Sequence, residues 1–167
     1  MNNKTIWLPL LLIVLVATAH GAEPTPAAVV VAFNKSISDR KLDAALSMLA
    51  TGSMQYTLRA AHVGATTGAD SMTSDLKNHW RTVGPVLFGA TKSYDRVATV
   101  EQTHAEGDLA TVWARIASKT VERNGKQRSD QFSEVYLLVR SGKQWQIGAI
   151  AGNRGTDSLA VEGPDAR

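Results

Sequence analysis

Histidine is the side chain best suited to acid–base chemistry and metal binding near neutral pH, and three histidines follow residue 21: His62, His79 and His104. They form no His-x-His or His-x-x-x-His pair, and the chain has no cysteine, so we expect neither a metal site nor a cofactor. His62 lies in a Gly- and Thr-rich stretch that could overhang a pocket, which makes it a candidate general acid or base. His79 adjoins Trp80 on a helical stripe, where a histidine is more often a boundary residue than a catalytic one.

Glu134 is the third candidate for acid–base chemistry, and its partner depends on how two strands pair. The Asn124-Gly125 dipeptide favours a two-residue type I′ turn, which would place Glu134 opposite Arg115 and Tyr136 opposite Trp113. A guanidinium stabilises the charged form of a neighbouring carboxylate, so Glu134 would be a poor base near neutrality and a better ligand anchor. The alternative is that Arg115 and Glu134 form an ordinary cross-strand pair near solvent.

Further polar and aromatic side chains indicate a ligand-binding pocket. Arg154 follows the last expected strand, where its guanidinium could hold a carboxylate through two parallel hydrogen bonds; the alternative is that it is solvated. Aromatic side chains supply candidate walls, although several are expected in the core of any domain of this size. The candidate ligand-binding residues are Tyr56, Trp80, Trp113, Arg115, Glu134, Tyr136 and Arg154.

The composition indicates one globular domain. The chain has 167 residues, 44% of them hydrophobic and 20% charged, which is far from the composition of disordered or coiled-coil chains. Its net charge of +3 is small and scattered, so it offers no clustered basic stripe for nucleic acid. We therefore expect a small-molecule ligand and no nucleic acid as partner.

Residues 1–21 have the pattern of a secretory signal peptide. Lys4 precedes an apolar run at residues 6–19, and the small residues Ala19 and Gly21 occupy the two recognition positions for cleavage. The run contains Pro9 and is shorter than the ~20 apolar residues that a membrane-spanning helix needs, so we expect cleavage after Gly21 or Ala22 and no membrane anchor afterwards. The mature chain would be periplasmic or secreted, in agreement with its lack of cysteine.

The mature chain is expected to begin with an extended lead-in at residues 22–26 and to fold as one domain over residues 27–154. Apolar residues at helical spacing predict one helix through Val30, Phe33 and Ile37 and a second from Leu42 to Leu49, which Gly52 would stop. Residues 53–59 are typical of a short strand and residues 60–70 of a loop. A third helix would run through residues 72–83 and end at Gly84-Pro85.

The second half of the chain is rich in β-branched and aromatic residues and has three Gly-containing turns. This pattern predicts a four-stranded antiparallel meander with strands at about 93–104, 109–122, 127–140 and 144–152. Residues 155–167 are expected to be a flexible tail. The fold class is therefore α+β, with three N-terminal helices packed on a curved, mainly antiparallel sheet. Because both faces of the meander carry large apolar side chains and the helices can cover only one, we expect a homodimer.

Two segments carry a resemblance to a known family. Gly107-Asp108-Leu109-Ala110-Thr111-Val112 after the first turn and Gly142-Lys143-Gln144-Trp145-Gln146-Ile147 in the closing hairpin resemble the nuclear transport factor 2-like superfamily, specifically its SnoaL-like and ketosteroid-isomerase-like secreted members. The resemblance implies a cone-shaped fold with a deep pocket, usually in a homodimer. It also assigns the strand face of Arg115, Glu134 and Tyr136 to that pocket.

The resemblance does not fix the function, because this scaffold serves isomerases, cyclases, dehydratases and catalytically silent modules. A ketosteroid isomerase needs an Asp base on its first strand, and residues 53–59 contain no acid. We therefore expect a domain that binds a small, partly apolar molecule, with a carboxylate as its candidate polar group, and does not transform it. The alternatives are an isomerase, dehydratase or cyclase that uses His62, His79 or Glu134, and a dimeric assembly module without a ligand.

Overall fold

The computed structural model describes residues 23–57 and 71–154 of the chain. The expected signal peptide, the candidate base His62 and the expected C-terminal tail lie outside the described residues. No helix in the described ranges is long and apolar enough to cross a membrane.

Two short helices open the domain. Helix α1 spans Pro26–Ser38, with Pro26 in its first turn and the Thr25 hydroxyl accepting a hydrogen bond from the Ala28 N–H at 3.2 Å. The expected apolar stripe of α1 is buried against the sheet. Helix α2 spans only Leu42–Ser47, and the chain enters a strand at Leu49. The expected continuation of this helix to Gly52 was wrong, because Leu49 pairs with Ile147 in the sheet and is fully buried there.

The third helix differs from its expected bounds at both ends. Helix α3 spans Leu76–Ala90, and the Asp75 carboxylate caps it by accepting from the Asn78 N–H at 3.0 Å. Residues 71–73, expected to begin this helix, form the short strand β2 (Ser71–Thr73) instead. The helix continues through Gly84-Pro85. Gly84 lies against the side chain of Leu42, where an added Cβ would approach within 3.2 Å, so the glycine permits close packing of α3 on α2.

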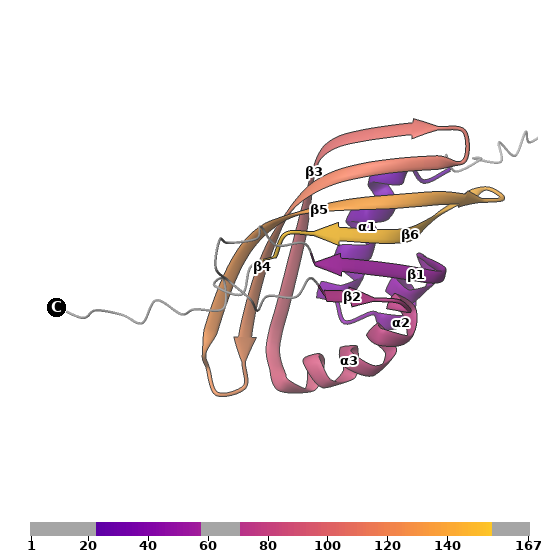
Figure 1. Cartoon of the computed structure of the whole chain (residues 1–167). Coiled ribbons are helices and arrows are strands. Elements are labelled where there is room, and N and C mark those ends of the chain that lie inside the picture. Colours follow the sequence, from indigo (N-terminus) through magenta and orange to yellow (C-terminus); the bar gives the residue numbers. More distant parts are fainter. Residues whose placement is uncertain (1–22, 58–70, 155–167) are drawn as a thin grey trace, which may run out of the picture.

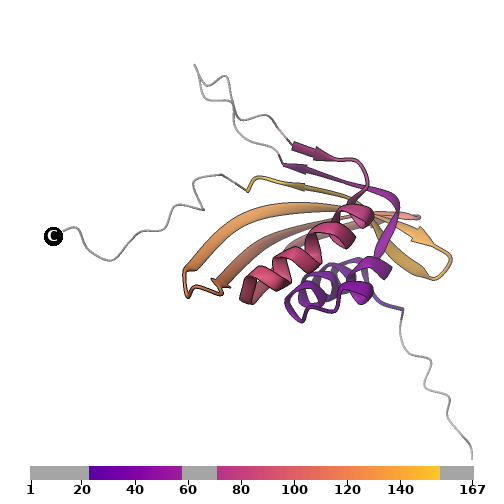
Figure 2. The same cartoon turned by 90° about the horizontal axis from the view of Figure 1, so that it is seen from below.

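Six strands form one curved sheet, with the helices on its inner face (Figures 1 and 2). The remaining strands are β1 (Leu49–Thr57), β3 (Thr91–Glu106), β4 (Leu109–Glu122), β5 (Gln127–Ser141) and β6 (Gln144–Gly152). Their order is β2-β1-β6-β5-β4-β3, and only β1 and β6 run parallel. The expected α+β fold with a four-stranded meander is confirmed.

The hydrophobic core lies between the helices and the inner face of the sheet. Its fully buried large side chains come from α1, β1, α3 and the meander: Val30, Phe33, Ile37, Leu49, Leu76, Val112, Ile116, Tyr136, Leu138, Ile147 and Ile150. Burial of apolar area on this scale is the main stabilising contribution to the fold.

The β4–β5 hairpin has a different register from the one expected. Its turn is a three-residue loop, Arg123-Asn124-Gly125, closed by the Glu122 N–H donating to the Lys126 carbonyl at 2.8 Å. Gly125 takes the left-handed position, with φ of 92°, as such loops require. Glu134 consequently pairs with Ala114, and Arg115 pairs with Ser133. The expected pairing of Arg115 with Glu134 was therefore wrong by one residue.

Side chains alternate between the two faces of a sheet. A register shift of one residue therefore changes which residues of β4 and β5 share a face. Glu134 and Tyr136 therefore share the inner face with Val112 and Ala114, whereas Trp113 and Arg115 lie on the outer face. Arg115 forms an ion pair there with Glu101 at 2.6 Å, and its side chain is 63% exposed.

Candidate functional site

A cavity of about 500 Å³ opens between α3 and the inner face of the sheet. From α3 it is lined by His79, Trp80, Val83, Leu87 and Ala90; from the sheet by Gln55, Thr91, Tyr94, Arg96, Thr120, Glu122 and Arg128; and after β6 by Arg154. One wall is thus mainly apolar, and three arginines belong to the opposite side. Ligand cavities in proteins commonly have this size and this mixture of apolar walls with a few polar groups.

The helical wall of the cavity follows from the spacing of residues along α3. Trp80, Val83 and Leu87 recur at three- and four-residue intervals and therefore share one face of the helix. Trp80 and Leu87 are half-buried and pack against the core. His79 lies at the edge of this face and is exposed.

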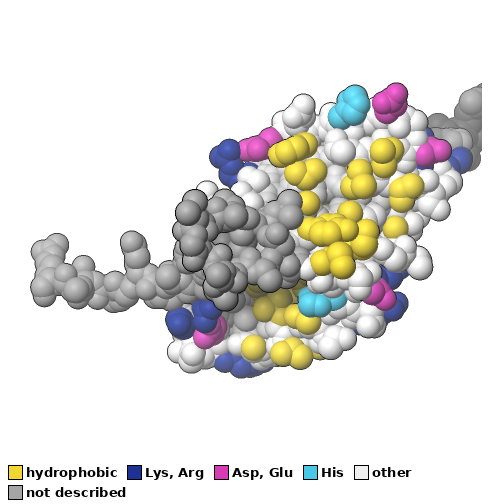
Figure 3. Space-filling view, viewed as in Figure 1, with side chains coloured by type: hydrophobic (Ala, Val, Ile, Leu, Met, Phe, Trp, Pro, Cys, Tyr) yellow, Lys and Arg dark blue, Asp and Glu magenta, His cyan; other side chains and the backbone are white. Residues whose placement is uncertain are grey.

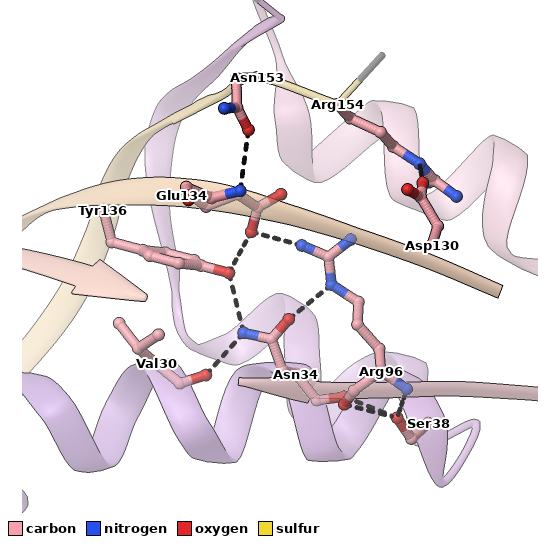
Figure 4. Close-up of polar contacts among 10 residues, drawn as sticks. Val30, Asn34, Ser38, Arg96, Asp130, Glu134, Tyr136, Asn153 and Arg154 are labelled. Carbon is pink, nitrogen blue, oxygen red and sulfur yellow. Dashed lines mark hydrogen bonds and ion pairs between the residues drawn. The ribbon is translucent and has the colours of Figure 1, made fainter. Parts of the chain in front are cut away.

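Behind the cavity lies a buried polar network that joins β3, β5 and α1 (Figure 4). Arg96 donates from Nη2 to Oε2 of Glu134 and from Nε to Oδ1 of Asn34, the latter at 2.5 Å. The Tyr136 hydroxyl donates to the same Glu134 oxygen and accepts from Asn34 Nδ2 at 2.8 Å. Asn34 Nδ2 also donates to the Val30 carbonyl at 2.9 Å. Every member of this network has at least one charged or hydrogen-bonded partner, as buried polar groups require.

The charges of this network are fixed by their surroundings. Burial lowers the pKa of the Arg96 guanidinium, but the charge of Glu134, the neighbouring Tyr136 and Tyr94 and the hydrogen bond to Glu134 together outweigh burial and raise this pKa above its ordinary value. Burial also raises the pKa of the Tyr136 phenol, and the negative charge of Glu134 raises it further. Tyr136 is therefore a neutral hydrogen-bond donor at all physiological pH values.

Strand β3 lies at the edge of the sheet, and α1 covers it at this point. The Ser38 hydroxyl accepts from the backbone N–H of Arg96 at 2.7 Å and donates to its carbonyl at 3.0 Å. These bonds replace the strand partner that an edge residue lacks. Both the backbone and the side chain of Arg96 are therefore held by hydrogen bonds to α1.

The other two arginines of the cavity are paired with carboxylates and are about one-third exposed. Arg154 donates from Nε to Asp130 at 2.7 Å, and Arg128 contacts Glu122 from Nη2 at 2.7 Å. Among the described residues, Nε of Arg128 is buried without a hydrogen-bond partner. Arg96 and Arg154 both lie over the ring of Phe132, with 5.3 and 5.1 Å between guanidinium carbon and ring centroid.

The structure distributes the sequence-predicted residues over three locations. Trp80, His79 and Arg154 line the cavity. Glu134 and Tyr136 lie behind it in the buried network. Tyr56, Trp113 and Arg115 lie on the outer face, where Tyr56 shares a row with Ala151 and Val135.

Arg96 and Asn34 were not identified from the sequence. Asn34 interrupts the apolar stripe of α1 one residue after Phe33, and it is fully buried. That signal could have indicated a buried polar partner on the sheet. Arg96 had no such signal. The expected register gave Glu134 a different partner, Arg115, and local sequence does not indicate that a residue two strands away forms the ion pair.

Within the described ranges, no group of three or more His, Asp or Glu side chains is arranged to hold a metal ion. The cavity instead offers guanidinium donors, one imidazole and an aromatic wall. The guanidinium groups favour an anion, and the aromatic wall favours a flat apolar group.

Neither a family model nor a curated protein matches the sequence. Solved structures do share the fold. A ketosteroid isomerase-like protein from Erwinia carotovora atroseptica has a TM-score of 0.57 at 13% identity, over 77% of this chain and 92% of its own. A candidate dehydratase of the nuclear transport factor 2-like family from Streptomyces avermitilis has a TM-score of 0.60 at 11% identity, over 78% and 93%.

A third similar structure is described as an association domain. It is a candidate calcium/calmodulin-dependent protein kinase II association domain from Xanthomonas campestris, with a TM-score of 0.59 at 11% identity, over 78% of this chain and 86% of its own. At these identities the likeness concerns the fold alone. The chain thus has the cone-shaped fold of the nuclear transport factor 2-like superfamily.

Proposed function

We propose that this protein binds a small, partly apolar, carboxylated molecule in its cavity and does not transform it. The observation that carries the proposal is the division of the cavity into an apolar wall on α3 and a guanidinium-bearing wall on the sheet. An apolar body would pack against Trp80 and Leu87, and a carboxylate would accept hydrogen bonds from the arginines.

The carboxylates near the cavity are engaged in ways that disfavour proton transfer. Glu134 accepts from both Arg96 and Tyr136, Asp130 accepts from Arg154, and Glu122 pairs with Arg128. A general base needs a free lone pair within reach of the substrate proton. This arrangement favours binding over catalysis.

His79 supports the alternative function, an enzyme of the isomerase, dehydratase or cyclase type. Its imidazole lines the cavity and could act as a general acid or base. Recovery of a bound carboxylate chemically unchanged would indicate binding, and its conversion to a product would indicate catalysis.

Binding can be tested with a panel of small aromatic and aliphatic monocarboxylates and their primary amides, using saturation-transfer NMR on residues 22–167. We expect carboxylates to bind and Trp80→Ala to weaken binding by about tenfold, because an aromatic wall contributes on the order of 1 kcal/mol or more. Trp113→Ala is the matched control, since Trp113 lies on the outer face, 49% exposed. Absence of binding across the panel, equal loss in both variants, or turnover of a bound carboxylate would each contradict the proposal.

We also propose that a second copy of the chain covers the outer face of the sheet. Large hydrophobic side chains are exposed there and gather over the meander (Figure 3). They include Val97, Leu109, Trp113, Leu137 and Val139. Soluble monomers rarely expose contiguous apolar patches of this kind, and two-fold symmetry pairs such a patch with itself.

Export with cleavage after Gly21 or Ala22 remains part of the proposal. It rests on the N-terminal sequence alone. Intact-mass measurement of the protein from a periplasmic fraction should give a chain that begins at Ala22 or Glu23, and retention of Met1 would contradict it.

A further inference from the structure

Arg96 differs from the other arginines of the cavity in its burial and in how it is held. Its side chain is 7% exposed, against 32% for Arg128 and 35% for Arg154. Its Nε and Nη2 are bonded to Asn34 and Glu134, whereas Nη1 has no hydrogen-bond partner among the described residues. Arg96 nevertheless lines the cavity, and Nη1 is not among the buried unpaired atoms of the described residues, so we infer that a ligand can reach this remaining donor.

The network fixes the guanidinium before any ligand arrives. Glu134 cannot rotate away from Arg96 without losing its bond from Tyr136, and Tyr136 is in turn held by Asn34. A side chain that is already ordered loses little conformational entropy on binding, which increases affinity. Arg128 and Arg154, each tied to one carboxylate at the more exposed part of the cavity, lack this preorganisation.

A structural role for the Arg96–Glu134 pair does not exclude a role in ligand binding, because it leaves one guanidinium nitrogen of Arg96 unused. A buried ion pair often stabilises a fold no more than well-packed apolar residues would, so burial of Arg96 and Glu134 is weak support for a stabilising role. Nη1 of Arg96 is not among the buried atoms of the described residues that lack a partner, so this donor is open to the cavity and can bond to a ligand oxygen there.

We propose that Arg96 is the anchor for the ligand's carboxylate, with Glu134, Tyr136 and Asn34 as its positioning residues, and that the ligand is a flat monocarboxylate. This inference rests on the proposed binding function, and it names Arg96 as the residue that binds the carboxylate. The three arginines are each paired with one carboxylate, so the site carries little excess charge and suits a single negative charge better than a phosphate dianion. The apolar part of the ligand would extend toward Trp80.

The test uses benzoate as the probe, with benzamide and phenyl phosphate as comparisons. In the double variant Arg96→Met/Glu134→Gln, which removes both charges together, benzoate should bind about tenfold more weakly or worse, because a hydrogen bond to a charged group is lost. Benzamide binding should change little. Arg115→Met, on the outer face, is the matched control and should bind benzoate like the wild type.

The outcomes separate this inference from the proposed function. Wild-type affinity for benzoate in the folded double variant would overturn the role of Arg96 but leave carboxylate binding intact. Failure of the wild type to bind benzoate or any other flat monocarboxylate, while an aliphatic carboxylate binds, would overturn this inference alone. Failure to bind any carboxylate would overturn both. Tighter binding of phenyl phosphate than of benzoate would overturn the monocarboxylate assignment.

The double variant could fail to fold, so a measurement on the wild type is included. Guanidinium ¹⁵N resonances report directly on hydrogen bonding of each arginine side chain. Benzoate should shift the resonances of Arg96 and leave those of Arg115 unchanged. Shifts confined to Arg128 or Arg154 would overturn the assignment of Arg96 as the anchor.

Discussion

Arg96 on β3 reaches past the intervening strand β4 to form a buried ion pair with Glu134 on β5. The pair joins strands that are not neighbours in the sheet, and α1 contributes Asn34 to the same network. The network therefore ties the edge strand, the centre of the meander and the first helix together at the back of the cavity. Its integrity should affect both the stability of the fold and the shape of the ligand site.

Replacing Glu134 with Leu should destabilise the fold by about 3 to 5 kcal/mol, because it leaves the buried Arg96 guanidinium without a counter-charge. Glu134→Gln should cost clearly less, since an amide oxygen can still accept from Arg96 and Tyr136. Urea unfolding followed by circular dichroism measures both. Equal stabilities for the Leu variant and the wild type would show that the pair is solvated in solution.

Tyr136 should make the protein sensitive to alkaline pH. Its pKa is raised in the folded state above the ordinary value of 10.0, so the unfolded chain loses the phenolic proton first as the pH increases. The stabilisation is therefore fully present below about pH 10 and is lost as the pH rises further. Tyr136→Phe should flatten this loss in unfolding experiments between pH 8 and 11, at a cost of about 1 to 3 kcal/mol at neutral pH from the unpaired polar groups.

Tyr56→Phe is the control for this pH dependence, because Tyr56 lies outside the network on the outer face. It should unfold with the wild-type alkaline profile. If Tyr136→Phe also keeps that profile, the buried phenol is not the group responsible.

Features of this fold that depend on residues close together in the sequence can be predicted, whereas features that depend on residues far apart in the sequence cannot. The stripe of Val30, Phe33 and Ile37 and the meander strands follow from local periodicity, and they were correctly predicted. The end of α2 was not, because pairing of Leu49 with Ile147, far along the chain, overrides local helix propensity. Gly84-Pro85 predicts a helix end, yet α3 continues through it, with Gly84 packed against Leu42.

The site was harder to predict than the fold, and the reason lies in one turn. Asn124-Gly125 is compatible with both a two-residue and a three-residue hairpin loop, and the choice decides which residues of β4 and β5 share a face. A two-residue loop groups Glu134 and Tyr136 with Trp113 and Arg115, whereas the observed three-residue loop places these two pairs on opposite faces. Trp80 and Arg154, two of the residues expected to bind a ligand, line the cavity; their part in binding stays a prediction.

The turn itself can be tested through its glycine. Gly125→Ala should destabilise the protein by about 1 to 2 kcal/mol, because φ at this position is 92° and a Cβ disfavours that conformation. The surroundings of Gly125 are open, so the cost is conformational rather than steric. Gly89→Ala is a matched control inside α3, also in open surroundings, and should stabilise the helix by about 0.5 to 1 kcal/mol. Destabilisation of equal size in both variants would contradict the three-residue loop.

The outer face should hold two copies of the chain together. We expect the wild type to be a dimer at micromolar concentration in light scattering, and Trp113→Glu to be a monomer, because a charge at the centre of an apolar interface would be buried without a partner. Val86→Glu is the control, since Val86 is 69% exposed on α3 and away from the outer face of the sheet. The Arg115–Glu101 pair on the same face should contribute under about 1 kcal/mol while it is solvated, so Arg115→Met should leave the dimer in place. A monomeric wild type, or a Trp113→Glu variant that remains dimeric, would show that this face has another role.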